Sequence, residues 1–327
     1  MNKNLKYNYV IFGTNMDLYM VSYNDLKNLK NARYLTEGIY TKNFFLKLLY
    51  KIHTSQRLNM IISLPFKNIW NKLAYVNDFD DDKPVCYIFF AGTYWFSKDY
   101  IAYLRKKQPN CKIVIFYQDL IKTHLKLFDE TKNLTDLTIT FDLGDAKHYG
   151  IIYHPLVYSY YNELKDRGYS SDVYFVGKAK DRLDLIISVY EKLKDYGLNC
   201  DFHITGVPQE KQKYVTEIDY CNYIDYSENL SHILGTKCLL EIMQGGGKGF
   251  TLRYAEAIMY DKKMITNNPE IKNAEFYSND KILTINDEKD VSEDFLKSLG
   301  QKITYKNKKE LSPISFIEFV DNLLKKE

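Results

Sequence analysis

Residues 241–256 read EIMQGGGKGFTLRYAE, and this stretch decides the fold. The apolar run at 237–242 predicts a buried strand, residues 244–249 are rich in glycine, and the apolar spacing over 251–260 predicts a helix. A strand that passes through a glycine-rich turn into a helix is the unit from which doubly wound α/β domains are built. The stretch therefore indicates a parallel sheet covered by helices.

The glycine-rich turn is also the strongest candidate for a binding site. Its backbone N–H groups can approach a phosphate without side-chain obstruction, and the start of the following helix favours an anion. Lys248 and Arg253 add positive charge, and Glu256 lies where a carboxylate can accept both hydroxyls of a ribose. The candidate binding residues here are Gln244, Gly246, Gly247, Lys248, Gly249, Thr251, Arg253 and Glu256. A glycine turn that only permits tight packing is the alternative, and neither a P-loop nor GxGxxG is present.

Two shorter segments of the same half have a similar character. Residues 175–182 read FVGKAKDR, a strand end followed by Gly177 and then by cations that include Lys180 and Arg182. Residues 265–271 read ITNNPEI, in which Asn268 can hydrogen-bond a sugar or a phosphate. A solvated basic helix start explains the first segment and ordinary turn chemistry the second about as well. Because all three segments follow predicted strands, we expect them at one edge of the sheet.

The strand and helix pattern extends over the whole chain in two similar series. Strands are predicted at 9–12, 60–64, 86–90, 113–117, 137–141, 172–176, 200–205, 237–242, 263–266 and 281–284, and helices at 44–52, 99–107, 183–196, 251–260 and 314–324. This alternation predicts an α/β protein of two Rossmann-like, doubly wound domains that face each other across a cleft. The predicted boundaries are 1–165 for the first domain, 166–308 for the second, and 309–327 for a terminal helix that packs back on the first domain.

Candidates for acid–base chemistry lie in the first half, near predicted strand ends. Asp142 and Asp145 follow the strand at 137–141, and His154 comes soon after. Each of these side chains can deprotonate a hydroxyl, although a helix cap or a surface charge is the plainer interpretation of each. No His, Cys and Asp residues stand at the spacing of metal ligands, so no metal site is predicted.

Composition limits the classes of partner and compartment. The 327 residues carry 45 basic and 42 acidic side chains, and the net charge of +3 is too small for a dedicated nucleic-acid binder. Five scattered cysteines form no disulfide framework, and neither a signal peptide nor a membrane-spanning run is present, so a cytoplasmic protein is expected. Peripheral contact with the inner face of a membrane and homo-oligomer formation are compatible with this composition. The 30 tyrosines suit sugar faces, but codon usage in an AT-rich genome explains them more simply.

The chain resembles bacterial GT-B fold glycosyltransferases of capsular, exopolysaccharide or lipopolysaccharide biosynthesis. The resemblance rests on FVG-x-x-K-x-R at 175–182, LEI-x-Q-x-G-x-x-G-x-T-L-R-x-x-E-A at 240–257 and K-x-I-T-N-N at 263–268. Further likeness occurs at 64–70, 116–120 and 154–159, so it covers most of the chain. It implies a transferase that moves a sugar from a nucleotide-diphosphate donor, with UDP the expected nucleotide, to a glycan or lipid-linked acceptor. No metal and no separate cofactor are implied.

The resemblance also suggests residue roles. It places the donor in the second domain, with Lys180 and Arg182 at the diphosphate, Arg253 as a phosphate ligand and Glu256 at the ribose. Glu256 matches the later glutamate of the E-x7-E motif of retaining families, but Lys248 stands where the earlier one would fall, which leaves the stereochemistry open. A sugar-nucleotide epimerase of similar two-lobed fold and a catalytically silent donor-binding or scaffold subunit are the alternatives.

Overall fold

The computed structural model describes residues 5–326 apart from 37, 40, 56, 57, 59, 60, 63, 93–96, 160–166, 221, 222 and 246–248. The chain forms two compact units. The first runs to His154 and resumes at Pro313, and the second comprises Pro155–Ser312. The boundary expected at 165/166 falls among residues outside the described part.

The first unit is built around a parallel sheet of six strands in the order β2-β1-β3-β4-β5-β6. Its strands are β1 (Asn8–Phe12), β2 (Ala32–Leu35), β3 (Val85–Phe90), β4 (Lys112–Tyr117), β5 (Leu137–Thr140) and β6 (Ile152–Tyr153). Its helices are α1 (Asp17–Ser22), α2 (Phe44–His53), α4 (Asn71–Ala74), α5 (Lys98–Lys107), α6 (Leu125–Thr131), α7 (Leu143–Tyr149) and α12 (Pro313–Leu324), with 3-10 turns η1 (Asn24–Asn28), η2 (Lys67–Trp70) and η3 (Ile121–Thr123).

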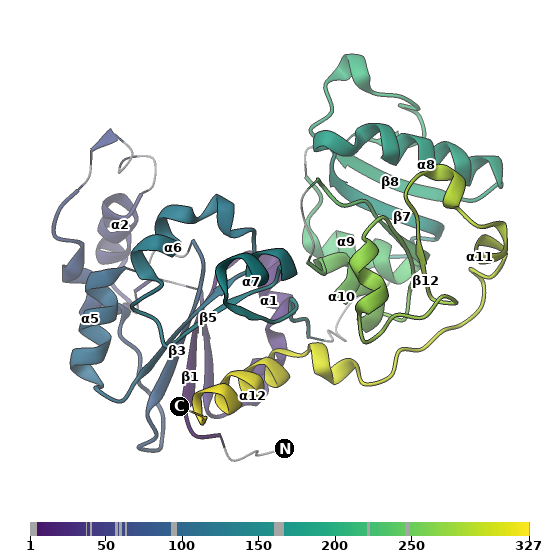
Figure 1. The fold of residues 1–327 in the computed structure, drawn as a ribbon. Helices are drawn as coiled ribbons and strands as arrows, with labels where there is room; N and C mark the ends of the chain where they lie inside the picture. The colour runs from purple at the N-terminus through teal and green to yellow at the C-terminus, as the bar shows by residue number, and fades with distance from the viewer. Residues whose placement is uncertain are drawn as a thin grey trace. The chain divides into compact units, whose positions relative to one another are not determined.

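Both faces of this sheet are apolar, as expected of strands that read as continuous apolar runs. On one face Tyr87, Phe89 and Ile115 pack against α5 and α6. On the other face Phe116 stacks on Phe316 of α12, with 4.9 Å between ring centroids. The final helix, yellow in Figure 1, thus belongs to the core of the first unit.

The second unit contains a parallel sheet of six strands in the order β12-β11-β10-β7-β8-β9. Its strands are β7 (Ser171–Lys178), β8 (Cys200–Thr205), β9 (Ile218–Asp219), β10 (Thr236–Glu241), β11 (Lys263–Thr266) and β12 (Ile282–Thr284). Its helices are α8 (Leu183–Asp195), α9 (Tyr226–Gly235), α10 (Leu252–Met259) and α11 (Glu293–Lys297), with 3-10 turns η4 (Lys180–Arg182), η5 (Gln209–Lys211), η6 (Pro269–Asn273), η7 (Glu288–Asp290) and η8 (Lys308–Leu311).

Helices cover both faces of the second sheet as well (Figure 1). Val173, Phe202 and Leu240 form one core with α8 and α11. On the opposite face β7 and β10 pack against α9, and β10 also packs against α10. The predicted class, an α/β protein with two doubly wound parallel sheets, is confirmed, while the cleft between them stays a prediction.

The strand predicted at 60–64 is wrong in its described part. Ile61 lies in a helical turn, and the side chains of Ile61 and Ile62 are 81% and 65% exposed. The second strand of the first sheet is instead β2, in which Arg33 and Tyr34 occupy the half-buried positions. Because these residues interrupt the apolar pattern, the sequence did not indicate this strand. Among the described residues, no helix is long and apolar enough to cross a bilayer.

Candidate functional site

The strand order of the second sheet marks where a ligand is expected. In chain order its strands lie 6-5-4-1-2-3, so the direction of winding reverses between β7 and β10. Ligands of open α/β sheets bind outside the carboxyl ends of the strands at such a switch point. Gly177 is the penultimate residue of β7, and the glycine-rich turn follows β10 directly. Two of the three predicted segments therefore meet at the switch point.

Side chains of η4 join the ends of these two strands. Arg182 donates from Nη1 to the carbonyl oxygen of Ile242, and from Nε and Nη2 to that of Lys178 at 3.0 and 2.9 Å. Lys180 Nζ donates to Gln244 Oε1. Burial lowers the pKa of Arg182, and the nearby carboxylates of Asp181 and Glu241 reduce this shift. Arg182 thus acts in this structure as a brace, while Lys180 is an exposed cation beside the turn.

Two glycines allow the strand ends to come this close. A Cβ atom on Gly177 would lie 3.1 Å from Nη2 of Arg182, and one on Gly245 would lie 3.1 Å from Oδ2 of Asp181. That Asp181 oxygen accepts a hydrogen bond from the Gly245 N–H at 3.1 Å. A Cβ at either glycine would therefore press on the side chain of Arg182 or Asp181, which would have to shift by a few tenths of an ångström.

Lys180 itself has an unusual backbone. Its φ of 46° lies in the left-handed region, which costs roughly 1–2 kcal/mol for a residue with a Cβ. Glycine or asparagine would adopt this conformation more easily. Residues held in such regions cluster at functional sites. Lys180 is one of five described non-glycine residues in this region of backbone space, and the one of them that lies at the switch point.

The start of α10 is fixed by a buried carboxylate below the turn. Thr251 is the N-cap of α10: its Oγ1 accepts from the Arg253 N–H at 3.1 Å and donates to Glu241. Thr266, at the end of β11, donates to the other oxygen of Glu241. Burial raises the pKa of Glu241, and the two threonine hydroxyls counteract it. Glu241 thereby links the ends of β10 and β11 to α10.

Two asparagines after β11 hold the turn from the other side. Asn267 Oδ1 accepts from the Met243 N–H at 2.6 Å, and Asn268 Nδ2 donates to the carbonyl oxygen of Gly249 at 3.0 Å. Asn268 is 1% exposed and caps η6 by accepting from the Glu270 N–H. The side chain of Asn268 therefore positions the turn.

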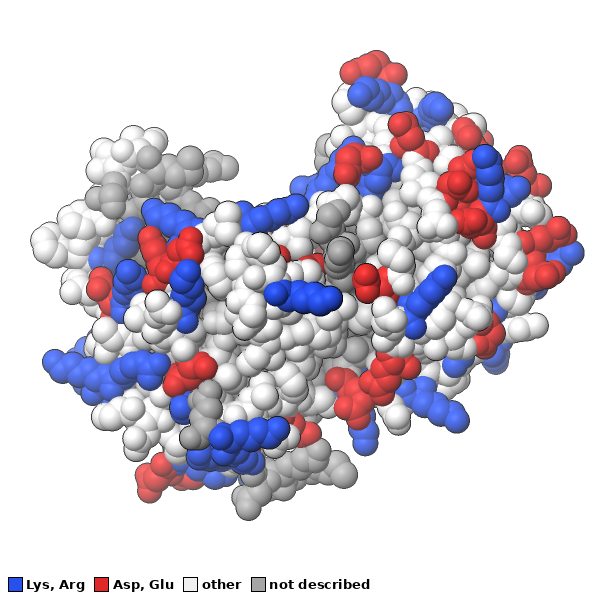
Figure 2. Space-filling model, in the orientation of Figure 1, with Lys and Arg blue, Asp and Glu red and all other residues white. Residues whose placement is uncertain are grey.

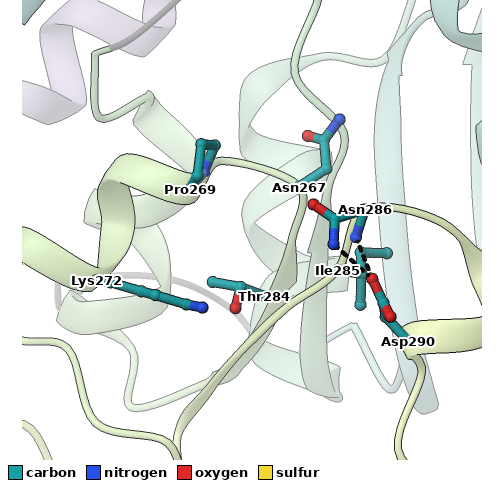
Figure 3. Close-up of a pocket in the computed structure, with 7 residues that line it drawn as sticks. All are labelled: Asn267, Pro269, Lys272, Thr284, Ile285, Asn286 and Asp290. Atoms are coloured by element: carbon teal, nitrogen blue, oxygen red, sulfur yellow. Dashed lines mark hydrogen bonds between the residues drawn. The ribbon is translucent and has the colours of Figure 1, made fainter.

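A pocket of about 310 Å³ lies beside this turn, at the carboxyl ends of β11 and β12 (Figure 3). Its lining residues are Asn267, Pro269, Lys272, Thr284, Ile285, Asn286 and Asp290. Asp290 accepts from the backbone and side-chain N–H groups of Asn286, while Lys272 enters from η6. The volume is at the lower end of the range for small-molecule pockets, roughly 300–1,000 Å³. Asn267 is shared between the pocket and the turn.

Glu256 is fully buried, and its partner Arg253 is half-buried. Arg253 Nη1 pairs with Glu256 Oε2 at 2.6 Å, and its guanidinium lies over the ring of Tyr174, 5.9 Å from the centroid. Glu256 is 0% exposed and also accepts from Tyr226 Oη at 2.7 Å and Asn229 Nδ2 at 3.4 Å. Burial raises the pKa of Glu256, an effect that Arg253 opposes. Contact of Glu256 with a ribose stays a prediction and requires these partners to move.

The predicted binding residues thus divide into three groups. One edge of the second sheet holds Gly177, Lys180, Arg182, Gln244, Gly249, Thr251 and Asn268. Glu256 is buried and Arg253 is half-buried, and both contact side chains of β7 or α9. Gly246, Gly247 and Lys248 lie outside the described residues.

The three acid–base candidates of the first unit each make contacts that stabilise the fold around them. Asp142 is the N-cap of α7 and accepts from the Asp145 N–H at 2.9 Å. Asp145 Oδ2 accepts from the Ile121 N–H at 2.7 Å, and burial, together with the Asp142 charge, raises the pKa of Asp145. His154 is 8% exposed and packs between Phe316 and Phe319 of α12. Of the three, Asp145 is the half-buried one, and it lies in the first turn of α7, which follows β5.

The first sheet has a switch point of its own, between β1 and β3. Gly13 follows β1 there, and a Cβ on it would lie 2.2 Å from Tyr34 Oη. That hydroxyl donates to the Thr14 carbonyl at 3.1 Å, and the Tyr34 ring stacks on Tyr23 at 5.2 Å. Phe90, at the end of β3, completes an aromatic cluster with both rings. The cluster gives this edge flat apolar rings and phenolic hydroxyls.

Away from both edges, the structure brings together a group that the sequence spacing did not indicate. Asp201 Oδ1 lies 2.7 Å from His203 Nε2, and Asp201 Oδ2 lies 2.6 Å from His232 Nδ1. His203 Nδ1 also lies 2.9 Å from Asp219 Oδ2. These atoms are close enough to surround a cation, but their mutual hydrogen bonds already satisfy them. The absence of a metal stays a prediction.

Sequence reasoning missed three residues that shape the candidate site: Asp181, Glu241 and Asn267. For Glu241 a signal existed, because a carboxylate at the end of an otherwise apolar strand must find buried partners. Asp181 and Asn267 act through single hydrogen bonds to backbone N–H groups of the turn. Such contacts follow from three-dimensional placement, which no local pattern specifies.

Comparisons with known proteins yield structural matches alone. No family model matches the chain, and no curated protein matches it. Similar solved structures include the MnaA protein of S. aureus with UDP (11% identity, TM-score 0.49, 97% of this chain and 96% of that chain covered). Others are the UDP-GlcNAc 2-epimerase of Neisseria meningitidis bound to UDP-GlcNAc (10%, 0.46, 98% and 99%) and the alpha,alpha-trehalose 6-phosphate synthase of Burkholderia multivorans (9%, 0.45, 96% and 92%). Similarity at this level identifies neither a reaction nor a substrate.

Proposed function

We propose that the protein is a glycosyltransferase that moves a sugar from a nucleotide-diphosphate donor to a glycan or lipid-linked acceptor in cell-surface polysaccharide synthesis. The observation that carries the proposal is the switch point of the second sheet, where an exposed lysine in a left-handed backbone lies beside a glycine-rich turn. In this proposal the second unit binds the donor and the first unit binds the acceptor.

The chemistry makes a specific demand on the donor site. The bond from the anomeric carbon to the diphosphate oxygen breaks, negative charge grows on the leaving diphosphate, and the acceptor oxygen bonds to the anomeric carbon. Fixed positive groups stabilise that growing charge, and in this proposal Lys180 and the backbone N–H groups of the turn supply them. Arg182 links the ends of β7 and β10 through its hydrogen bonds to the carbonyl oxygens of Lys178 and Ile242.

The acceptor hydroxyl must lose a proton as it attacks. Asp145 is the candidate base that fits best, because burial raises the pKa of its carboxyl and so makes the carboxylate more basic. Asp142 serves α7 as its cap, and His154 is enclosed by the aromatic rings of α12. The expected nucleotide is UDP, from the resemblance of residues 175–182 and 240–257.

A panel of nucleotide sugars tests the proposal directly. The protein is incubated with UDP-, GDP- and CDP-sugars, and both the free nucleotide and the recovered sugar nucleotide are quantified by chromatography. Slow release of one nucleotide, abolished by Lys180→Gln, supports glycosyl transfer with water as a poor acceptor. Recovery of an epimerised sugar nucleotide would instead identify an epimerase, and binding without any turnover would identify a silent donor-binding subunit.

A further inference from the structure

The first unit exposes an unusual concentration of large apolar side chains. Of the 17 that are exposed among the described residues, ten lie within residues 44–69. We name these ten the α2 surface: Phe44, Phe45, Leu48, Leu49, Ile52, Leu58, Ile61, Ile62, Phe66 and Ile69. Several are more than two-thirds exposed, including Phe44 at 70% and Phe45 at 73%. Large apolar side chains exposed in such number within one segment are typical of an interaction site.

The α2 helix is apolar on both of its sides. Leu46 and Tyr50 pack against the core of the first unit, and Asn43 caps the helix by accepting from two backbone N–H groups. A helix that lies on a protein usually turns charged or polar residues to the solvent. Here Phe45, Leu48 and Ile52 take those positions instead. The core contacts therefore do not account for the apolar character of the outer side.

The segment after α2 is held so that it extends the same surface. His53 Nδ1 accepts from Trp70 Nε1 at 2.9 Å, and its Nε2–H donates to the Pro65 carbonyl at 2.6 Å. This clamp fastens η2 to the end of α2. Phe66 is 75% exposed, and its φ of 61° is uncommon for a bulky residue. The fold thus presents Phe66 to solvent in spite of its backbone preference.

The charge of this region has one sign. Residues 38–77 contain no Asp or Glu, whereas they contain Lys42, Lys47, Lys51, Arg57, Lys67 and Lys72. The chain as a whole is nearly balanced, so the asymmetry is local. In Figure 2 the described surface over α2 is mostly white, and both blue and red side chains lie next to it. Large apolar groups accompanied by lysines are typical of segments that insert at the interface of an anionic bilayer.

We propose that the α2 surface docks the protein on an anionic lipid bilayer, with the ten apolar side chains inserted among the acyl chains and the lysines at the headgroups. A second copy of the chain fits less well, because a two-fold interface would set the same surface against itself and bring its lysines against the same lysines. The inference does not depend on the donor site, since α2 belongs to the other unit.

Vesicle sedimentation with the full-length protein tests this. We expect binding to vesicles of phosphatidylcholine and phosphatidylglycerol in equal parts, and much weaker binding to phosphatidylcholine alone. Phe44→Ser with Phe45→Ser should reduce binding by at least about tenfold, because each buried CH₂ contributes about 0.8 kcal/mol. Lys51→Gln and Lys67→Gln should each reduce it about fivefold, since a cation near such a surface contributes about 1 kcal/mol.

Matched controls come from α6 of the same unit. Leu125 is 46% exposed and Lys126 is exposed, so Leu125→Ser and Lys126→Gln remove the same kinds of group elsewhere and should leave vesicle binding unchanged. Equal binding to both vesicle types, or no binding to either, would overturn the proposal. So would a stable dimer, measured by light scattering, that the Phe44 and Phe45 substitutions dissociate. Loss of vesicle binding in variants that still bind nucleotide would leave the proposed function standing.

Discussion

Glu256 has no exposed surface, and its ion pair with Arg253 offsets the free-energy cost of burying its carboxylate. Removing one member of a buried ion pair leaves an uncompensated charge, which typically costs about 3–5 kcal/mol. We therefore expect Glu256→Gln and Arg253→Met each to lower the free energy of unfolding by about that amount. Urea unfolding of both variants and of the double variant checks this.

The double variant supplies the control for that pair. Because it removes both charges at once, it should lose less stability than the two single losses added together. Additive losses would show that the two side chains do not act as a pair. Nucleotide affinity, measured on folded Glu256→Gln, separates the structural role from the predicted contact with a ribose.

Lys180 offers a test in which stability and binding separate. Lys180→Gly relieves the left-handed backbone, so the variant should be at least as stable as the parent despite the added chain entropy of glycine. It should also bind nucleotide at least about tenfold more weakly, because a hydrogen bond to a charged group contributes roughly 1.5–3 kcal/mol. Thermal unfolding and calorimetry measure the two effects. A less stable variant that binds normally would rule out a functional reason for the lysine.

The Asp201 group predicts a pH dependence of stability. Burial would lower the pKa of His203, but hydrogen bonds and charge from Asp201 and Asp219 raise it above its usual 6.5. Burial would raise the pKa of Asp201, but His203 and His232 lower it from 3.8 to about 2. The contribution of His203 to the free energy of unfolding is fully present below pH 6.5 and is lost as the pH rises through the pKa of His203 in the folded protein. The contribution of Asp201 is fully present above pH 3.8 and is lost as the pH falls towards 2.

Both contributions to stability are therefore fully present between pH 3.8 and pH 6.5. A variant of Asp201 should be measured inside this range and again at higher pH. Asp201→Asn should cost most free energy of unfolding near about pH 5, and the cost should fall as the pH rises through the raised pKa of His203. Urea unfolding at the two pH values measures the difference. An equal cost at both would mean that the group is not charged in the way described.

At the scale of elements, the N-terminus of α10 is held by the hydroxyl group of Thr251. Thr251 Oγ1 caps the helix and donates to the buried Glu241. Thr251→Val keeps the shape but removes both interactions, and we expect a loss of about 2–4 kcal/mol from the missing cap and the unsatisfied carboxylate. Thr251→Ser should restore most of it. Chemical denaturation that places the valine variant within about 0.5 kcal/mol of the parent would contradict the network.

The elements that could be predicted are those whose sequence pattern is local. Strands such as β3 and β4 are buried on both faces and therefore read as unbroken apolar runs. The edge strands β6 and β9 have two residues each, too few for a pattern. The strand prediction at 60–64 was wrong because Ile61 and Ile62 are exposed, and a strand pattern does not distinguish a core from an exposed apolar surface.

In the candidate site too, some features follow from a local sequence pattern and others only from the three-dimensional structure. Cations and glycines at strand ends were predictable, since parallel strands bring their carboxyl ends to one edge. The burial of Glu256 was not, because its position one turn into α10 is equally compatible with facing a ligand or facing α9. The group around Asp201 was also missed, since β8, β9 and α9 each contribute to it.

At the scale of the whole molecule, the chain leaves the first unit at His154 and returns to it at Pro313. Phe316 of α12 is 0% exposed and stacks on Phe116 of β4, and Asp321 accepts from the Lys6 N–H at 2.9 Å and Tyr9 Oη at 2.8 Å. Phe316→Ala should cost the first unit about 3–5 kcal/mol. The exposed Asn322→Ala is the control, and denaturant unfolding that gives the two variants equal stability would refute this role of α12.

We expect the second unit to bind a nucleotide diphosphate where β7 and β10 end. Isothermal titration with UDP, GDP and CDP tests it on the full-length parent, on Lys180→Gln and on Lys302→Gln. Lys302 is exposed near Thr304, whose carbonyl accepts from Lys281 at the opposite, amino-terminal end of β12. We predict that one nucleotide binds, that Lys180→Gln weakens it at least about tenfold, and that Lys302→Gln leaves it unchanged. Equal affinities in all three proteins, or no binding by the parent, would contradict the claim.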